Sequence, residues 1–322
     1  MDSATAQARF RGCLLGLAVG DAVGTTLEFC APGSFTPIDD MHGGGPFALR
    51  AGQWTDDTSM ALCLAHSLLY RQGFDAADQM NRYCNWYQHG YLSSTGTCFD
   101  IGGTVRQALE RYLDGGPAFS GSDDPRSAGN GSLMRLAPVA MFYAQRPEQL
   151  GERAADSSRT THAAPEALDA CRLFAFQLRA ALLGSGRDEV LRPAALPSQS
   201  LVTPAIGALL VRVHASVARA QIRGTGYVVD ALSAALWCLE PVHDLLSNSA
   251  RKAKWMNCRL VLSLRSQFFH SLRFFSSQAK LRSTIHRLGM TLKVCSSLRL
   301  AICTVSCSPK ISRTPSANRT PV

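Results

Sequence analysis

Apolar residues recur at a spacing of about 3.6 along most of the first 240 residues, and few segments alternate between apolar and polar residues as strands do. Residues 58–72 are the clearest case, because Met60, Leu64 and Leu68 fall on one face and Gly73 follows as a helix-ending glycine. Similar faces predict further helices over residues 75–87, 102–113, 132–143, 164–183 and 227–238. The pattern therefore predicts an all-α fold, a compact bundle of several helices.

Gly, Pro, Ser and Asp residues are concentrated between the predicted helices, in residues 31–33, 42–46, 115–130 and 193–204. These residue types favour turns with special backbone conformations. Loops held by a rigid helical scaffold often carry binding and catalytic groups. Candidate functional residues are therefore expected in or beside these segments.

The sequence Thr55-Asp56-Asp57-Thr58 stands at the start of the first clear helix. Carboxylate and hydroxyl oxygens at a rigid helix start are ligands that hard divalent cations prefer. The same residue types are also ordinary N-terminal capping residues, and for an isolated motif capping is the more common outcome. The motif by itself leaves both interpretations open.

Two further carboxylates stand at informative places. Asp21 interrupts an apolar run, and a buried carboxylate needs a partner, a bound cation or a helix end that it caps. Asp100 stands just ahead of the helix predicted over residues 102–113, where an N-cap and a functional carboxylate look alike.

Residues 129–132, Gly-Asn-Gly-Ser, lead into a predicted helix and leave backbone amides free for an anion such as a pyrophosphate. A glycine-rich loop alone is weak evidence for such a site. His162 precedes another predicted helix, and a single histidine is more often structural than functional.

The order and spacing of seven motifs between residues 9 and 237 resemble the ADP-ribosylglycohydrolase family. The motifs are Gly20-Asp21, Glu28, Trp54-Thr55-Asp56-Asp57-Thr58, Asp100-Ile101-Gly102, Gly129-Asn130-Gly131-Ser132, Thr161-His162 and residues 224–230.

The resemblance implies an all-α hydrolase that cleaves the glycosidic bond between ADP-ribose and an acceptor, with two Mg²⁺ or Mn²⁺ ions. It implies that the partner is an ADP-ribosylated protein or a small ADP-ribosyl compound. The implied metal ligands are Thr55, Asp56 and Asp57, and the implied catalytic residues are Glu28, Asp56, Asp57 and Asp100. The implied substrate-binding residues are Asp100, Ile101, Gly102, Gly129, Asn130, Gly131, Ser132 and His162.

The chain departs from the family pattern in one respect. The family completes its metal site with a later Asp-x-Asp-Thr segment, but residues 245–322 contain no Asp or Glu. We therefore expect weak binding of Mg²⁺ or Mn²⁺ and slow or absent hydrolysis. The alternative is a non-catalytic ADP-ribose-binding protein that keeps residues 129–132 and His162.

Residues 245–322 also carry fourteen Lys and Arg residues, whereas residues 1–244 hold 19 Lys and Arg against 24 Asp and Glu. The sequence thus predicts a helical domain over residues 1–240, incomplete at its C-terminal end, and a disordered basic tail over 241–322 that is not a domain. The interpretation that we favour for the tail is an out-of-frame or truncated-gene product from about Cys238. The alternative is a real basic extension that binds nucleic acid or an anionic membrane surface, and no nucleic-acid binding is expected elsewhere.

Eleven cysteines without a Cys-x-x-Cys pair indicate reduced thiols, and hence a cytoplasmic protein, rather than a disulfide framework or a zinc site. The apolar run over residues 13–20 is short and is followed by Asp21, which argues against a signal peptide. No segment reaches the roughly 18 uncharged apolar residues of a membrane span, so no membrane association is expected from the body of the chain.

Overall fold

The computed structural model describes residues 3–31, 34–36, 38, 40–197, 201–212 and 216–239. Within these ranges the secondary structure is helical, with three isolated β-bridges and no strand. The predicted all-α fold is confirmed. The tail predicted over residues 241–322, with its disorder and its origin, lies outside the described residues.

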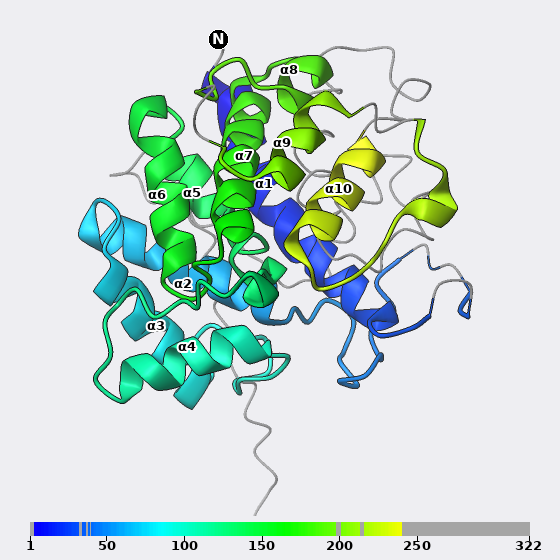
Figure 1. The fold of residues 1–322 in the computed structure, drawn as a ribbon. Coiled ribbons are helices and arrows are strands. Elements are labelled where there is room, and N and C mark those ends of the chain that lie inside the picture. Colours follow the sequence, from blue (N-terminus) through cyan, green and yellow to red (C-terminus); the bar gives the residue numbers. More distant parts are fainter. Residues whose placement is uncertain are drawn as a thin grey trace, which may run out of the picture.

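Helix α7 (Pro165–Leu183) forms the centre of the fold. It packs against α1 (Ser3–Gly24), α5 (Ala137–Phe142), α6 (Pro147–Arg159) and α10 (Val228–Leu239). Figure 1 shows α7 between α6 and α10, with α1 crossing behind it. Most of its side chains are buried, because apolar residues cover nearly its whole circumference.

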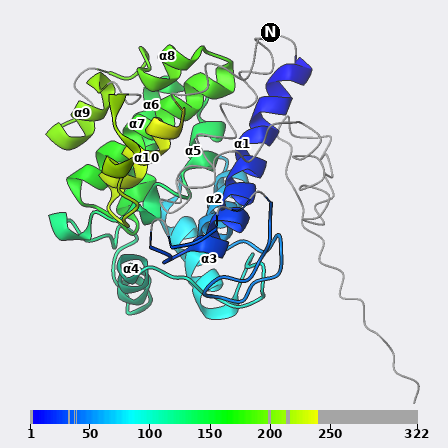
Figure 2. The same cartoon turned by 90° about the vertical axis from the view of Figure 1, so that its right-hand side faces the viewer.

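A second group of helices lies beside this centre. Helix α2 (Asp56–Arg71) packs against α1, α5 and α3 (Ala76–His89), and α3 in turn packs against α4 (Gly103–Leu113). The view in Figure 2 places α3 and α4 together at one end of the molecule, below α1 and α2. The start of α2 is thereby buried at the junction with α1.

The remaining elements are short. Helices α8 (Arg187–Leu191) and α9 (Pro204–Val211) pack against α7. The 3₁₀ turns are η1 (Thr25–Leu27), η2 (Pro125–Ser127), η3 (Asn130–Ser132) and η5 (Arg219–Gln221). None of the described helices combines the length and the apolar character that a membrane span requires.

Three details of the fold differ from the prediction. Residues 132–143 do not form one helix: η3 ends at Ser132 and α5 begins only at Ala137, because Pro138 fits only the first turn of a helix. Gly73 does not adopt the left-handed conformation that ends α2, because Gln72 does, at φ 54°. Helix α6 was not predicted, since its buried face includes Ser157 and Ser158 and is not uniformly apolar.

Candidate active site

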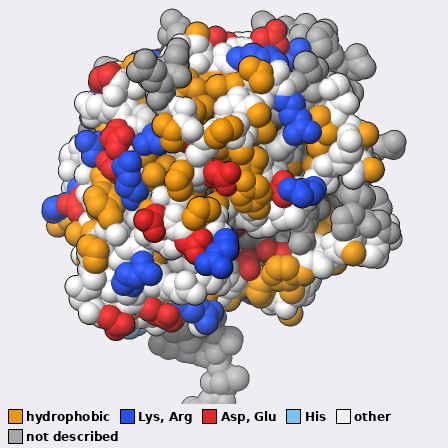
Figure 3. Space-filling model, viewed as in Figure 1, with side chains coloured by type: hydrophobic (Ala, Val, Ile, Leu, Met, Phe, Trp, Pro, Cys, Tyr) orange, Lys and Arg blue, Asp and Glu red, His pale blue; other side chains and the backbone are white. Residues whose placement is uncertain are grey.

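A cavity of about 380 Å³ opens where the start of α2, the end of η1, the start of α4 and the loop around η3 meet. Its volume is within the range of small-molecule sites, about 300–1,000 Å³. Figure 3 shows it as a hollow with acidic side chains at its floor. The lining residues are Gly24, Glu28, Phe29, Asp56, Asp57, Asp100, Ile101, Gly102, Gly103, Thr104, Val105, Gly129, Asn130, Gly131, Met134, His162, Gly224 and Gly226.

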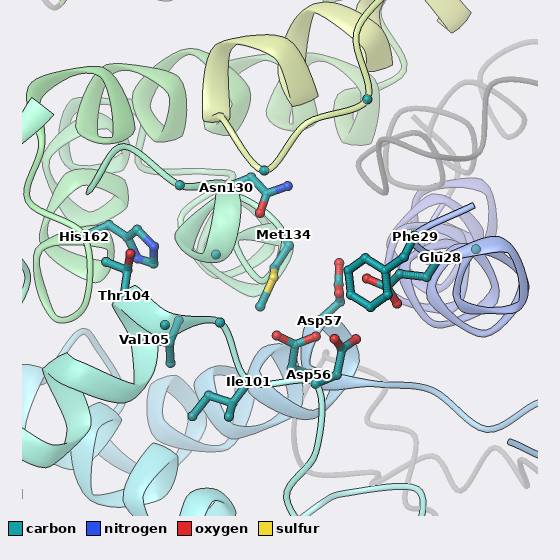
Figure 4. Close-up of a pocket in the computed structure, with 18 residues that line it drawn as sticks. Glu28, Phe29, Asp56, Asp57, Ile101, Thr104, Val105, Asn130, Met134 and His162 are labelled. Atoms are coloured by element: carbon teal, nitrogen blue, oxygen red, sulfur yellow. The ribbon is translucent and has the colours of Figure 1, made fainter. Parts of the chain in front are cut away.

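Asp56 and Asp57 occupy the first two positions of α2 and line the cavity. Their exposed fractions are only 7% and 8%. The partial positive charge of the helix N-terminus stabilises carboxylates at these positions. Figure 4 shows both carboxylates directed into the cavity, near Glu28.

The residue that caps α2 is Asp21, which lies within α1 and is 3% exposed. Its carboxylate accepts hydrogen bonds from the Thr55 amide at 3.0 Å and the Thr58 amide at 3.0 Å. It also accepts from the hydroxyl groups of Thr55 at 2.8 Å and Thr58 at 2.7 Å. A carboxylate from one helix therefore satisfies free amides at the start of another.

Thr55 does not act as the capping side chain that its sequence position suggested. Its hydroxyl group lies 2.8 Å from Asp21 and 3.2 Å from the carboxylate of Asp56. The residue is fully buried and lies outside the cavity lining. Its hydroxyl oxygen thus connects the buried cap to the first of the two cavity carboxylates.

Glu28 and Phe29 form the wall that faces this carboxylate pair. Glu28 follows η1 directly, and Phe29 adopts a left-handed conformation with φ 61°. The Phe29 side chain is 69% exposed, and its ring meets that of Phe47 edge to face at 6.4 Å between centroids. In Figure 4 both residues lie on the opposite side of the cavity from His162.

Asp100 lines the cavity ahead of α4, but the N-cap of that helix is Gly102. The ordinary capping interpretation is therefore not the one that the structure shows. Asp100 has φ 58°, a conformation that is uncommon for residues other than glycine and that tends to occur at functional sites. It lies in the loop that runs from Gly90 to α4, three residues before the helix begins.

Gly90 is expected to be essential for the shape of this loop. It has φ 67°, and a Cβ atom there would overlap the backbone of Gly96 and Thr97. Gly90→Ala should lower the free energy of unfolding by roughly 2–4 kcal/mol, from backbone strain and overpacking together. Urea unfolding measures the change.

Gly115→Ala is the matched control, because Gly115 also has a positive φ, 90°, but has open space where the Cβ would be. It should cost only about 1–2 kcal/mol, the backbone term alone. Equal losses in the two variants would mean that the contact with Gly96 does not constrain the loop.

The loop around η3 is fastened to the segment before α10. The Asn130 amide donates to the Gly226 carbonyl at 2.9 Å, and the Val228 amide donates to the Ala128 carbonyl at 3.0 Å. Gly129, Asn130 and Gly131 line the cavity, as the sequence suggested, whereas Ser132 is buried outside it. The Ser132 hydroxyl group lies 2.7 Å from that of Ser158.

His162 closes the far end of the cavity beneath this loop, with 2% of its side chain exposed. A Cβ atom on Gly131 would lie 2.8 Å from its ring, so the loop can approach only because glycine is there. Burial, and then the nearby charge of Arg135, lower the pKa of His162 from 6.5 to about 3. The ring is therefore neutral at neutral pH.

Sequence reasoning missed several of the lining residues. Phe29 carried no signal, because an exposed aromatic residue in a turn follows no periodic pattern. Met134 and Val105 lie inside predicted helical ranges and carry no separate functional signal, although both line the cavity. Gly224 and Gly226 belonged to a motif of the resemblance but had been given no role.

The donors in this cavity are of the type that a hard divalent cation prefers, since Glu28, Asp56, Asp57 and Asp100 all present carboxylate oxygens to it. Across the part of the chain that the structure describes, however, no three acidic, histidine or cysteine side chains converge as a ready cation site. The donor chemistry of the cavity therefore fits a hard divalent cation.

The cavity thus presents carboxylates on one side and a glycine loop with a histidine on the other. A family model for ADP-ribosylglycohydrolase matches residues 2–256, and the chain belongs to this family. It is 48% identical over 248 residues to the ADP-ribosylarginine hydrolase Tri1 of Pseudomonas putida. This match covers 76% of this chain and 66% of the relative. It is 42% identical over 244 residues to the enzyme of the same name from Serratia proteamaculans, covering 73% and 64%.

A solved structure titled ADP-ribosylglycohydrolase-related protein complex shares the fold, with a TM-score of 0.64 and 34% sequence identity. The match covers 89% of this chain and 99% of that one. The chain spans slightly less than two thirds of the length of the two curated relatives.

Proposed function

We propose that this chain recognises ADP-ribosyl groups and hydrolyses their glycosidic bond to an acceptor, at a reduced rate. The observation that carries the proposal is the composition of the cleft. One side presents Glu28, Asp56, Asp57 and Asp100, and the other presents the loop of Gly129 to Gly131 with neutral His162. The substrate that we propose is an ADP-ribosylated protein or a small ADP-ribosyl compound. The proposed acceptor group is an arginine side chain, since two relatives are named ADP-ribosylarginine hydrolases.

In this proposal the two walls have different roles. The loop of Gly129, Asn130 and Gly131 receives the ADP-ribose diphosphate, and the Asn130 side chain is its donor, because the amides of Gly129 and Asn130 already donate to the carbonyls of Ser127 and Gly226. The segment Asp100-Ile101-Gly102 contacts the ribose next to the scissile bond. Ser132, which is buried outside the lining, supports the loop from behind.

On the acidic wall, Asp56 and Asp57 would hold Mg²⁺ or Mn²⁺ with the hydroxyl oxygen of Thr55, which donates its proton to Asp21. When bound, a divalent cation supplies stabilisation of the charge that develops as the glycosidic bond breaks. Glu28 faces the pair and would exchange protons with the attacking water. Charge repulsion between these carboxylates favours cation binding at this wall.

We propose reduced activity because residues 245–322 contain no Asp or Glu, so they cannot supply the second carboxylate pair of the family pattern. Loss of groups that only support metal ligands already costs about 10–100-fold in metal affinity or activity. Loss of direct ligands should cost at least as much. The second candidate function follows from the same observation: a non-catalytic protein that binds ADP-ribose through residues 129–131 and His162.

The test combines release of ADP-ribose from ADP-ribosylarginine with calorimetric binding of ADP-ribose. We expect turnover at least about 10-fold below that of an intact relative, and abolition by EDTA or by the double variant Asp56→Asn, Asp57→Asn. Asp123→Asn, an exposed loop carboxylate outside the cavity, is the control and should behave as the parent.

Turnover equal to that of an intact relative would overturn the proposed impairment. ADP-ribose binding that EDTA leaves unchanged, without any hydrolysis, would favour the non-catalytic binder. Absence of both binding and hydrolysis would contradict the proposed function.

A further inference from the structure

Arg135 is wholly buried behind the cleft, directly beneath the residues that hold His162. Within the described ranges its guanidinium group pairs with no carboxylate. It stacks on the ring of Tyr83 at 4.5 Å and donates through Nη2 to the Ser157 carbonyl at 3.3 Å. The same nitrogen donates to Thr160 at 3.2 Å and Thr161 at 2.7 Å. A buried cation held only by neutral groups is costly, so its position calls for a role.

The contact with Thr161 determines where the hydroxyl proton of that residue lies. Arg135 can only donate, so Thr161 Oγ1 accepts from it at 2.7 Å. Thr161 Oγ1 also lies 2.9 Å from Nδ1 of His162. Its own proton is free to point at that nitrogen.

The reverse arrangement is disfavoured. If His162 Nδ1 carried a proton and donated it to Thr161, the Thr161 hydroxyl proton would have no acceptor among the described residues. Thr161 is fully buried, so bulk solvent does not reach its hydroxyl group to supply an acceptor. An unsatisfied buried donor costs about 1–3 kcal/mol. The network therefore makes Nδ1 the acceptor and leaves the ring proton on Nε2.

Nε2 lies on the cavity side of the ring. A Cβ atom on Gly129 would be 3.3 Å from it and one on Gly131 would be 3.2 Å away, so it faces the loop that lines the cavity. Figure 4 shows the ring at the end of the cavity opposite Glu28. No described group accepts a proton from Nε2. The atom is not buried without a partner, so it is open to the cavity.

We propose that Arg135 and Thr161 are positioning residues that fix His162 in its Nε2–H tautomer, so that the cleft presents a neutral hydrogen-bond donor to an acceptor oxygen of bound ADP-ribose. The identity of the ligand rests on the proposed function, whereas the tautomer does not. A neutral donor binds a ligand oxygen strongly only when the oxygen is well placed for a hydrogen bond. A cation would also attract an anion that is misplaced.

The backbone of His162 is held as firmly as its ring. Its amide donates to the Ser158 carbonyl at 2.7 Å, and its carbonyl accepts from the Ser158 hydroxyl group at 2.8 Å. Ring rotation would break the contact with Thr161, and backbone shift would break those with Ser158. The donor direction is therefore set before a ligand arrives, which reduces the entropic cost of binding.

The test reads the tautomer directly by long-range ¹⁵N–¹H NMR of histidine-labelled protein. The signal of His162 is identified by its loss in His162→Gln. We expect a protonated Nε2 and an unprotonated Nδ1 in the free parent protein. Thr161→Val removes the hydroxyl group but keeps the shape, and it should convert His162 to a mixture of tautomers.

Thr161→Ser is the matched control, because it keeps the hydroxyl group that Arg135 and His162 share. It should retain the parent tautomer and bind ADP-ribose within about twofold of the parent, whereas Thr161→Val should bind about tenfold more weakly. A merely structural role of Thr161 would lower stability without changing the ring proton.

A proton on Nδ1 in the parent protein would overturn the inference, even if Thr161→Val does not fold. An unchanged tautomer in a folded Thr161→Val would overturn it as well. If the parent protein does not bind ADP-ribose, the proposed function fails, while the tautomer in the free protein still decides the inference.

Discussion

Replacement of Asp21 by Ala is expected to lower the free energy of unfolding by about 3–5 kcal/mol, because it removes the shared acceptor of several buried hydrogen bonds. The carboxylate accepts from two amides and two hydroxyl groups at the start of α2, through Thr55 and Thr58. Alanine would leave the amides of Thr55 and Thr58 and the hydroxyl group of Thr58 buried without this acceptor, whereas the hydroxyl group of Thr55 could turn to the carboxylate of Asp56. Each unsatisfied group carries its own cost of about 1–3 kcal/mol, partly relieved by relaxation.

The same change should loosen the first turn of α2, which carries Asp56 and Asp57. Mn²⁺ binding by the folded fraction is therefore expected to fall along with stability. Urea unfolding measures the first effect and Mn²⁺ titration of folded protein measures the second.

Asp123→Ala, in an exposed loop, controls for the loss of one carboxylate and should change stability by less than about 0.5 kcal/mol. A second pair isolates one contact: Thr58→Val removes the hydroxyl group that donates to Asp21 at 2.7 Å, and Thr58→Ser retains it. An Asp21→Ala protein as stable as Asp123→Ala would show that Asp21 does not cap α2.

Asp21 illustrates how far sequence reasoning reaches. A carboxylate inside an apolar run predicted that a partner must exist, since burial without one is costly. The partner itself lies 34 residues away, at Thr55. Local sequence suggested that Thr55 was the cap, but the tertiary contact between α1 and α2 gave that role to Asp21.

The periodicity of apolar residues predicted the helices correctly where their buried faces are uniformly apolar. Helix α7 was predicted to within one residue because its apolar residues are continuous. The prediction over residues 132–143 failed because Pro138 restarts the helix inside an apolar run. Helix α6 was missed because Ser157 and Ser158 are buried by hydrogen bonds rather than by apolar contact.

The site followed the order of motifs rather than periodicity. The residues Glu28, Asp56, Asp57 and Asp100 were singled out by resemblance, and the fold brings all four to one cavity. The motifs do not determine which side chains enter the cavity, because the direction of each side chain depends on the local turn. Ser132 shares a motif with Gly131 but turns into the core, and only coordinates reveal that Arg135 stands behind His162.

Between pH 6.5 and about 3, the protein is expected to lose stability that depends on His162, because the folded-state pKa of this ring is lowered to about 3. Over this range the unfolded chain binds a proton that the folded ring does not. Protonation therefore favours unfolding as the pH falls, and the contribution is fully present only above about 6.5. The pKa difference corresponds to a loss on the order of 4 kcal/mol across the range.

Comparison of the parent with His162→Gln separates this effect from the titration of carboxylates, which both proteins share. In urea unfolding experiments, the parent should lose more stability than His162→Gln as the pH is lowered from 7 to 4. His89→Gln, which removes an exposed histidine at the end of α3, is the matched control. A difference between parent and His162→Gln that stays constant with pH would mean that the ring is not held neutral by its burial, and that Arg135 does not act on it.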